Sequence, residues 1–344
     1  MVHFGLDSME LARVTSGQDF SLVRLRTEGD IMRDHSNRRK VGAGLLVLAL
    51  LVTFGVSAAA AAPLSPIKVL VTNDDGVSAP GIDALVEELR TRSDFNLTVI
   101  APAANSSGTG ENRTATIQVN DATTASGYAA KAVTGFPGDT TLWGILEEMK
   151  ANPPDLVVSG INFGQNLSAE VIPLSGTVGA ATWAARLGIP AFAVSAGFGS
   201  PVNYGQAAKY TADLVEKFRT SGGFRKKMKE KDPSGSNFFR GLVLNINVPT
   251  CTTGSVRGAR VVAVGRSSNF TSYTLLSGTA VTQVWEAVVT SGTPFTTDCA
   301  STVDPVYTDL DGFNNGFATV TPLGAERNAV GRRIKQFKFV EKLF

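Results

Sequence analysis

A strand, helix, strand pattern that begins near residue 67 constrains the fold of this chain more than any other feature. An apolar run at residues 67–72 is followed by a helical hydrophobic period at 82–92 and by a second apolar run at 97–101. Apolar residues that recur every three to four positions indicate an amphipathic helix, whereas short continuous apolar runs are typical of buried strands. Two such strands joined through a helix predict a parallel sheet that helices cover.

The same alternation continues along the chain, and it predicts an α/β fold. We expect a Rossmann-like, doubly wound, mostly parallel sheet with helices on both faces. Beyond residue 260 the apolar segments become shorter and alternate, which predicts a C-terminal β-hairpin extension. The further expected strands are 155–159, 191–195 and 242–248, the further helices 178–187 and 204–218, and the short segments 261–264, 271–276 and 281–289.

Three parts are expected in the chain of 344 residues. Residues 1–62 are a leader with a signal peptide, residues 63–325 form one globular domain, and residues 326–344 are a basic C-terminal tail that would pack on a partner subunit. A hydrophobic content of 43% and a charged content of 18% fit an ordinary globular protein.

The leader has the composition of an export signal. Arg38, Arg39 and Lys40 precede an uncharged run at residues 41–62, which is rich in leucine in its middle and in alanine at its end. A basic start, an apolar middle and a small-residue end are the parts of a secretory signal peptide. We therefore expect cleavage near Ala62, export to the periplasm or the exterior, and no stable membrane association after cleavage.

Two questions about the leader stay open. The uncharged run approaches the length of about 20 residues that a spanning helix needs, so an uncleaved membrane anchor is the alternative. Met32 would begin a signal of conventional length, whereas Met1 does not, so the true start codon is not settled.

The positions of histidine and cysteine exclude several classes of enzyme. His3 and His35 both belong to the leader. Without histidine, the mature chain cannot be a Ser-His-Asp hydrolase, a histidine phosphatase or a protein with a His-ligated zinc or iron site. Cys251 and Cys299 are the two cysteines, and an exported protein with two is expected to join them in a disulfide.

The net charge bears on two classes of partner, nucleic acids and membrane surfaces. The formal net charge is only +2. A nearly balanced chain gives no sign of binding to nucleic acid or to a membrane surface.

Two adjacent acids, Asp74 and Asp75, directly follow the first predicted strand. In an open α/β sheet the ligand crevice lies outside the carboxyl ends of the strands, so both acids are expected at that edge. Neighbouring carboxylates repel each other unless a cation or a proton lies between them, and oxygen ligands suit Mg²⁺, Mn²⁺ or Ca²⁺. The alternative interpretation is an ordinary polar turn with a helix cap.

Three later loops leave the sheet at the same edge. A serine among glycines follows the second strand, an asparagine follows the strand at 155–159, and a Ser-Gly-Thr sequence opens the helix at 178–187, where main-chain amides favour anions. Each has a structural alternative: a flexible loop, a left-handed turn and a helix N-cap. The residues concerned are Ser107, Asn162, Ser175, Gly176 and Thr177.

These positions belong to an ordered set of motifs that spans about residues 67–323. The motifs are VTNDDGVSAPGI at 71–82, AP at 101–102 with SG at 107–108, VVSGIN at 157–162, SGTV at 175–178, LNINVP at 244–249 and TVTPL at 319–323. The set resembles the SurE survival-protein phosphatases, which are metal-dependent nucleotidases acting on nucleoside monophosphates.

The resemblance implies a reaction and the residues for it. One divalent cation, Mg²⁺ or Mn²⁺, would activate water for the hydrolysis of nucleoside 5′- and 3′-monophosphates, and the enzyme would be a homodimer or homotetramer. Typical members are cytoplasmic and lack an export signal, so the resemblance by itself determines neither the location nor the physiological phosphomonoester of this chain. By the resemblance the metal ligands are Asp74, Asp75, Ser107 and Asn162, with the two aspartates also catalytic, the phosphate-binding residues are Ser175, Gly176 and Thr177, and Asp139 is either a contact beside the site or a helix cap.

Three other functions compete with this one. Residues 251–257 fit a cysteine phosphatase, with a thiol at Cys251, a glycine-bearing loop and Arg257, although a strand rather than the required helix follows. A haloacid-dehalogenase-type phosphatase would separate the two aspartates by one residue. The third alternative is a secreted protein that binds a metal or a nucleotide without turnover.

Overall fold

The computed structural model describes residues 64–229, 241–266, 270–279, 282–289, 297–324 and 334–344. The chain divides into two units, Met1–Ala60 and Ala61–Phe344, and the described residues all belong to the second. The signal peptide, its cleavage site and the alternative membrane anchor lie outside them. Within the described ranges, no helix is both long and apolar enough to cross a membrane.

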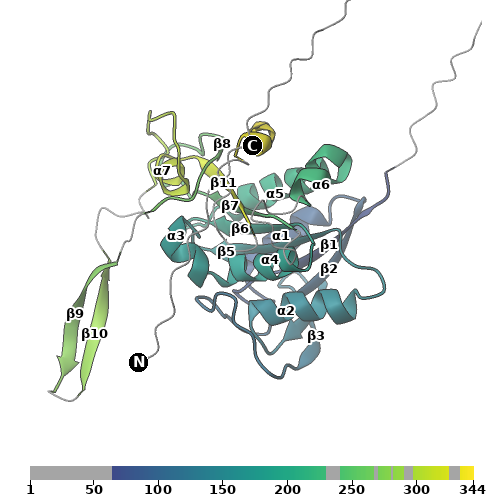
Figure 1. Ribbon diagram of the computed structural model, residues 1–344, viewed down its shortest axis with the longest axis horizontal. Coiled ribbons are helices and arrows are strands. Elements are labelled where there is room, and N and C mark those ends of the chain that lie inside the picture. The colour runs from purple at the N-terminus through teal and green to yellow at the C-terminus, as the bar shows by residue number, and fades with distance from the viewer. Residues whose placement is uncertain (1–63, 230–240, 267–269, 280–281, 290–296, 325–333) are drawn as a thin grey trace, which may run out of the picture. The chain divides into compact units, whose positions relative to one another are not determined.

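A nine-stranded sheet forms the centre of this unit (Figure 1). Its strand order is β3-β4-β2-β1-β5-β6-β7-β11-β8. Strands β4, β2, β1, β5, β6 and β7 run parallel, β3 and β11 pair antiparallel with β4 and β7, and β8 is parallel to β11. The predicted doubly wound, mostly parallel sheet is thus confirmed. The strands are β1 Ile67–Thr72, β2 Phe95–Pro102, β3 Val119–Thr123, β4 Ala129–Val133, β5 Leu156–Phe163, β6 Ala191–Ala196, β7 Val243–Val248, β8 Ala259–Val261 and β11 Ala318–Leu323.

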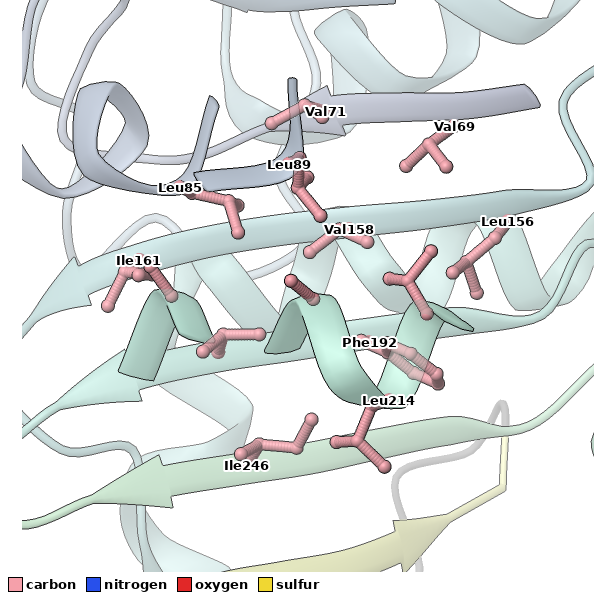
Figure 2. Close-up of a cluster of buried hydrophobic side chains, with 14 of the residues drawn as sticks. Val69, Val71, Leu85, Leu89, Leu156, Val158, Ile161, Phe192, Leu214 and Ile246 are labelled. Atoms are coloured by element: carbon pink, nitrogen blue, oxygen red, sulfur yellow. The ribbon is translucent and has the colours of Figure 1, made fainter. Parts of the chain in front are cut away.

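Helices cover both faces of the sheet because successive side chains of a strand point to opposite sides. Val69 and Val71 of β1, Leu85 of α1 and Leu214 of α5 belong to one buried cluster, which Figure 2 shows, with Leu214 beside Phe192 and Ile246. Leu70 of β1 and Val178 of α4 belong to a second buried cluster on the other face. The helices are α1 Pro80–Leu89, α2 Pro137–Trp143, η1 Gly144–Glu148, α3 Ser168–Val171, η2 Ile172–Leu174, α4 Gly176–Arg186, α5 Tyr204–Thr220, α6 Gly222–Met228, α7 Asp309–Asn314, α8 Ile334–Phe337 and η4 Lys338–Leu343.

The strand order reverses between β1 and β5. From β1 the chain first adds β2 on one side and later places β5 on the other. The loops that follow β1 and β5 therefore leave the sheet in opposite directions and open a crevice at the carboxyl ends of these strands. Asp74 and Asp75 follow β1 at this crevice, and Asn162 lies near the end of β5.

The C-terminal part agrees only partly with the sequence prediction. Strands β9 (Phe270–Gly278) and β10 (Gln283–Val289) form the expected antiparallel hairpin. The segment predicted at 261–264 does not belong to a hairpin: its strand is β8, which pairs in parallel with β11. A three-residue strand takes its direction from a distant partner, and local alternation does not reveal that partner.

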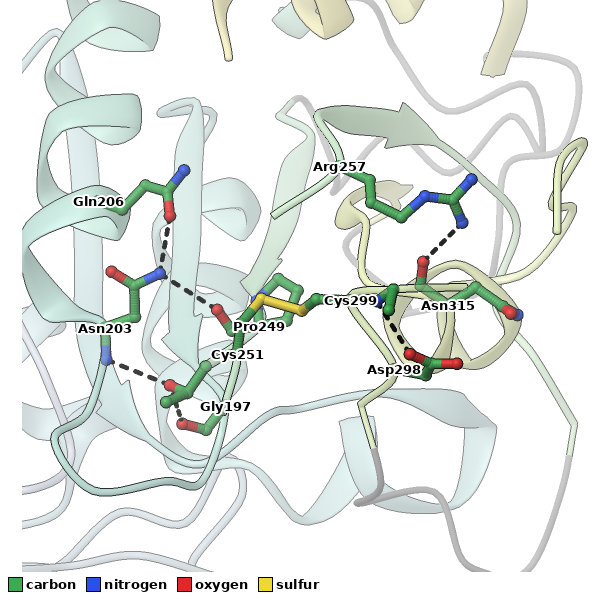
Figure 3. Close-up of a disulfide and its surroundings, with 11 residues drawn as sticks. Gly197, Asn203, Gln206, Pro249, Cys251, Arg257, Asp298, Cys299 and Asn315 are labelled. Carbon is green, nitrogen blue, oxygen red and sulfur yellow. Dashed lines mark hydrogen bonds between the residues drawn. A yellow bond between two sulfur atoms is a disulfide. The ribbon is translucent and has the colours of Figure 1, made fainter. Parts of the chain in front are cut away.

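A disulfide joins Cys251, just after β7, to Cys299 (Figure 3). The two Cα atoms are 5.9 Å apart, and 48 residues separate the cysteines along the chain. Thr250, beside Cys251, donates its hydroxyl to the Gly197 carbonyl (2.6 Å) and accepts the main-chain N–H of Asn203 (3.1 Å). The disulfide thus connects the end of β7 with the segment that precedes α7.

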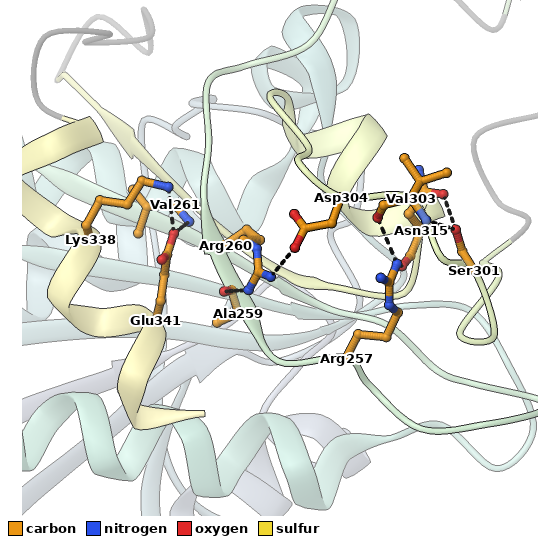
Figure 4. A network of polar contacts seen from close by, with 10 residues as sticks. All are labelled: Arg257, Ala259, Arg260, Val261, Ser301, Val303, Asp304, Asn315, Lys338 and Glu341. Atoms are coloured by element: carbon orange, nitrogen blue, oxygen red, sulfur yellow. Dashed lines mark hydrogen bonds and ion pairs between the residues drawn. The ribbon is translucent and has the colours of Figure 1, made fainter.

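Charged and polar contacts hold the C-terminal segments on the unit (Figure 4). Arg260 pairs with Asp304 at 2.8 Å, and Arg257 donates to the carbonyls of Asn315 and Val303. Glu341 of η4 accepts the main-chain N–H of Val261 at 2.7 Å.

The described end of the C-terminal tail packs on its own chain. Phe337 and Val340 are fully buried in the core beside α5 and β8, and the hydroxyl of Tyr210 donates to the Val340 carbonyl (3.2 Å). No partner subunit is needed for these contacts.

Candidate active site

A closed turn presents the two acids after β1. Asn73 is fully buried, donates its amide to the Gly76 carbonyl (2.8 Å) and accepts the Gly76 N–H (3.2 Å). Gly76 has a φ of +109°, which glycine adopts without strain, and a Cβ there would lie 3.3 Å from the main chain of Ala104. The turn therefore depends on both Asn73 and Gly76.

Asp74 is a buried carboxylate that lies against the start of α4. It is 2% exposed and accepts the hydroxyl of Thr177 at 2.6 Å, and the Thr177 main-chain N–H also donates to it. Burial raises the pKa of Asp74 to about 6, the Thr177 hydroxyl opposes the rise, and the charge of Asp75 adds to it. A Cβ at Gly176 would lie 2.8 Å from the Cβ of Asp74, so the helix can approach this closely only with glycine there.

Asp75 joins the loops that follow β2 and β5. Its Oδ2 accepts the main-chain N–H of Phe163 (2.9 Å), and its Oδ1 accepts the Ser107 hydroxyl and the Asn105 amide, both at 3.4 Å. Burial raises the pKa of Asp75 against these hydrogen bonds. Burial, together with the charge of Asp75, also raises the pKa of Tyr204 to about 12, so this phenol is neutral at pH 7.

Asn162 lies inside β5, not in the loop that the sequence predicts after residue 159. The pairing of β5 with β6 is irregular between Ser159 and Asn162, so the strand continues past its glycine to Phe163. Asn162 is 7% exposed and donates its amide group to the Gly164 carbonyl at 2.6 Å. Because the amide nitrogen is engaged, the carbonyl oxygen is the atom that remains for a cation.

One cavity of about 230 Å³ collects these groups. Four of the residues predicted from the sequence line it: Asp74, Ser107, Asn162 and Ser175. Asp75 reaches the same place through its hydrogen bond to Ser107, whereas Gly176 and Thr177 contact Asp74.

The donor atoms of this cavity fit a hard divalent cation. Two carboxylates, a hydroxyl and an amide carbonyl are all oxygen ligands, which Mg²⁺ and Mn²⁺ prefer. Burial leaves both carboxylates with raised pKa values, so a bound cation would stabilise their charged forms. In the part of the chain that the structure describes, no three His, Cys, Asp or Glu side chains cluster, so the candidate ligand set consists of two acids together with neutral oxygen donors.

The residues predicted to bind phosphate have more than one role. Ser175 is the N-cap of α4, because its hydroxyl oxygen accepts the N–H of Val178 (3.1 Å). The same hydroxyl can also donate one hydrogen bond, since a serine both donates and accepts. Thr177 directs its hydroxyl to Asp74, so it positions that carboxylate.

A network of buried amides that begins at the cavity wall with Asn166 was not predicted. Asn166 donates to Ser195 (2.9 Å) and approaches Thr177 (3.4 Å), and its main chain is held by the side chains of Asn245 and Asn247 on β7. The network therefore extends from Asp74 through Thr177 to β7. Two asparagines that alternate with apolar residues in a fully buried strand are the sequence signal that could have revealed it.

Asp139 is a helix cap and not part of the cavity wall. Its Oδ2 accepts the main-chain N–H groups of Phe136 (2.9 Å) and Thr114 (3.0 Å) at the start of α2. Of the two roles considered for Asp139, the structure favours the cap.

The cysteine-phosphatase interpretation is inconsistent with the structure. The sulfur of Cys251 is bonded to Cys299 and is not a free thiol. Arg257 is followed by strand β8 and not by a helix, so no helix N-terminus lowers a thiol pKa there.

The fold and the cavity together define a class: a doubly wound α/β protein with an acidic, oxygen-lined site at the point where its strand order reverses. The sequence profile described as Survival protein SurE matches residues 69–271. The chain belongs to the SurE family.

Individual relatives agree with this assignment. A protein named 5′-nucleotidase SurE from Desulforamulus reducens is 34% identical over 260 residues, which are 74% of this chain and 92% of the relative. One of the same name from Halobacterium salinarum is 35% identical over 269 residues, 75% of this chain and 91% of the relative. The crystal structure of the SurE protein from Aquifex aeolicus superposes with a TM-score of 0.56 at 27% identity, over 80% of this chain and 99% of that one.

Proposed function

We propose that this chain is a divalent-metal-dependent phosphomonoesterase that hydrolyses nucleoside 5′- and 3′-monophosphates to nucleoside and phosphate. The relatives named 5′-nucleotidase SurE support the 5′ activity. The observation that carries the proposal is the convergence of Asp74, Ser107 and Asn162 on one cavity, with Asp75 hydrogen-bonded to Ser107.

The side chains of the cavity have separate roles in this reaction. Asp74, Asp75, Ser107 and Asn162 would hold one Mg²⁺ or Mn²⁺ ion. When bound, such an ion supplies Lewis-acid activation of a phosphoryl oxygen or of a water molecule.

Groups at the start of α4 would position Asp74 and bind the phosphoryl group. The Thr177 hydroxyl fixes one oxygen of Asp74 and favours its charged form. The Ser175 hydroxyl and the N-terminus of α4 lie beside Asp74 and favour the negative charge of a phosphoryl group. No protein nucleophile is required, and one of the two aspartates would accept the proton of the attacking water.

Phosphate release tests the proposal directly. The chain without residues 1–62 is incubated with 5′-AMP and 3′-AMP in the presence of Mn²⁺ or Mg²⁺, and again with a chelator. We expect release that the chelator abolishes and that the metal restores. Equal rates with and without chelator would contradict the metal-dependent mechanism, and binding of AMP without any release would favour the alternative of a binding protein.

A matched pair of variants tests the ligand assignment. Asp75→Asn keeps the size of the side chain but removes its charge, so it should lower kcat/KM by at least about a hundredfold, which is the scale of losing one electrostatic contact in a catalytic site. Asp139→Asn, at the helix cap outside the cavity, is the control and should lower stability more than turnover. Full activity of Asp75→Asn would remove Asp75 from the site.

We also propose that the protein is exported. The basic, leucine-rich and alanine-rich order of the leader supports a cleaved signal, and the disulfide fits an oxidising compartment. N-terminal sequencing of the protein recovered outside the cytoplasm should begin near Pro63. Recovery of the full-length chain from membranes would favour the anchor instead.

The homodimer or homotetramer and the division at residues 63–325 and 326–344 stay predictions. Light scattering of the purified chain measures the oligomeric state. Limited proteolysis tests the domain division, with cleavage expected near residue 325.

A further inference from the structure

An exposed apolar wall lies in the same cavity as the acids. Phe163, Leu174 and Phe198 line it, and they are 50%, 54% and 48% exposed. Large apolar side chains that remain exposed together beside polar groups mark a place where a ligand binds.

The two phenyl rings form one surface of fixed shape. Their centroids are 5.1 Å apart and their planes meet at 81°, an edge-to-face arrangement. Gly164 has a φ of +102°, and a Cβ there would lie 2.4 Å from Cζ of Phe198, so glycine leaves the space that this ring occupies. The main-chain N–H of Phe198 donates to Oε1 of Gln165 at 3.2 Å, which holds the loop after β6 against the loop after β5.

This surface is tied to the predicted metal ligands through the main chain. Phe163 follows Asn162 directly, and its N–H is the donor to Asp75. Leu174 directly precedes Ser175, the cap of α4. A ligand that lies on the rings therefore has its neighbouring atoms close to the oxygen-lined part of the cavity.

Gln165 adds a polar group to this wall. It lines the cavity, is 6% exposed, and uses its Oε1 for Phe198. Its Nε2 is buried and has no hydrogen-bond partner among the described residues. Because buried donors are nearly always paired in folded proteins, this amide is available to an acceptor on a ligand that enters the cavity.

We propose that Phe163 and Phe198 form the subsite for the base of a nucleoside monophosphate, with the Gln165 amide donating to an acceptor on the base or ribose. The inference rests on the proposed function and specifies the alcohol that is released: a nucleoside, whose planar base lies on the two rings while its ribose hydroxyl leaves the phosphorus. Stacking on a phenyl ring is possible for every base, so the subsite selects nucleotides as a class and discriminates weakly among the bases.

Two substrates that differ only in the base test the subsite. 5′-AMP and ribose 5-phosphate carry the same phosphate ester, so the ratio of their kcat/KM values isolates the contribution of the base. Phe198→Ala and Phe163→Ala should each lower this ratio about tenfold, mainly through KM for AMP, which is the scale of losing one base–aromatic stack. Phe198→Trp should keep the ratio high, because it keeps an aromatic face.

Leu187→Ala is the matched control. Leu187 is 41% exposed at the end of α4 and does not line the cavity, so its truncation should leave the ratio at the wild-type value. Gln165→Met, which keeps the length but removes the donor, should lower the ratio less than the phenylalanine variants.

Binding of AMP and of ribose 5-phosphate by calorimetry separates this inference from the proposed function. Wild-type ratios in both phenylalanine variants, or equal losses on both substrates, would overturn the subsite while the phosphatase stands. If the wild type binds AMP without releasing phosphate and Phe198→Ala weakens that binding, the subsite stands and the proposed hydrolysis fails. If the wild type neither binds AMP nor hydrolyses it, both fail.

Discussion

At the scale of single residues, the site depends on a carboxylate whose charged form is disfavoured by burial. Asp74 is buried, has Asp75 as its neighbour in the chain, and receives one side-chain hydrogen bond, from Thr177. Because that bond opposes the rise of the Asp74 pKa, Thr177 influences how readily Asp74 becomes a ligand.

Thr177→Val should therefore raise the pKa of Asp74 further. Valine has nearly the same shape but no hydroxyl, and the loss of a hydrogen bond to a charged group costs about 1.5–3 kcal/mol. We expect the acidic limb of kcat/KM against pH to move to higher pH, and kcat/KM at pH 6 to fall by about tenfold or more. Thr177→Ser keeps the hydroxyl and should follow the wild-type profile, so superimposable profiles for all three proteins would exclude this role.

Stability against pH should also reveal Asp74 in the metal-free protein. Its folded pKa of about 6 lies above the ordinary value of 3.8. The folded state then binds the proton more tightly, so the contribution of Asp74 to stability is fully present below pH 3.8 and is lost as the pH rises through 6. Two pKa units correspond to at most about 3 kcal/mol.

Urea unfolding in a chelator measures this contribution. The free energy of unfolding of the wild type minus that of Asp74→Asn should fall between about pH 4 and pH 7, the range that these two pKa values define. A difference that stays constant or grows with pH would show that the pKa of Asp74 is not raised.

At the scale of elements, the first turn of α4 holds the site together. Ser175 caps the helix, Gly176 lies against Asp74, and Thr177 donates to Asp74. One turn thus supplies a cap, a close approach and a donor at consecutive positions.

Gly176→Ala should reduce both activity and stability, although alanine is the better helix former. A Cβ at residue 176 would meet Asp74 at 2.8 Å, so the helix and β1 would have to move apart. Gly205→Ala in α5 is the control, because a Cβ there meets nothing within 4 Å, and it should stabilise the protein by up to about 1 kcal/mol. Chemical denaturation and kcat/KM measure both variants, and a gain in stability for Gly176→Ala would contradict the packing described.

Strands whose two faces are both buried could be predicted from the sequence. Strands β1, β5, β6 and β7 appear in the sequence as continuous apolar runs because both of their faces are covered. Strand β3 was not predicted, because this edge strand is mostly exposed and carries polar residues.

The site residues could be predicted from the positions of the strand ends. The residues that form hydrogen bonds with them could not. Asp74, Ser107 and Asn162 meet because parallel strands deliver their carboxyl ends to one edge. The hydrogen bond of Thr177 depends on how α4 packs beside the turn after β1, which no local pattern records. The alternation of Asn245 and Asn247 with apolar residues indicates that they need buried partners, but it does not identify Asn166 as that partner.

At the scale of the described unit, the crevice and the disulfide are separate features. The cavity lies where the strand order reverses between β1 and β5, whereas Cys251 and Cys299 do not line it. The disulfide is therefore expected to contribute to stability and not to chemistry.

Replacing both cysteines by serine tests this separation. The Cys251→Ser, Cys299→Ser double variant leaves no unpaired thiol and should lose about 2–4 kcal/mol of unfolding free energy, the usual effect of one disulfide. Its kcat/KM for AMP at 25 °C should stay within about twofold of the wild type, since structural changes distant from a site are nearly independent of it. Loss of turnover in a folded double variant would revive a role for Cys251.

Phe163 divides its two functions between its main chain and its ring. The bond to Asp75 uses only the amide that every residue except proline possesses, so an exchange of the side chain leaves that bond in place. Substitutions at position 163 could therefore change which phosphate ester is preferred without changing the residues that carry out hydrolysis.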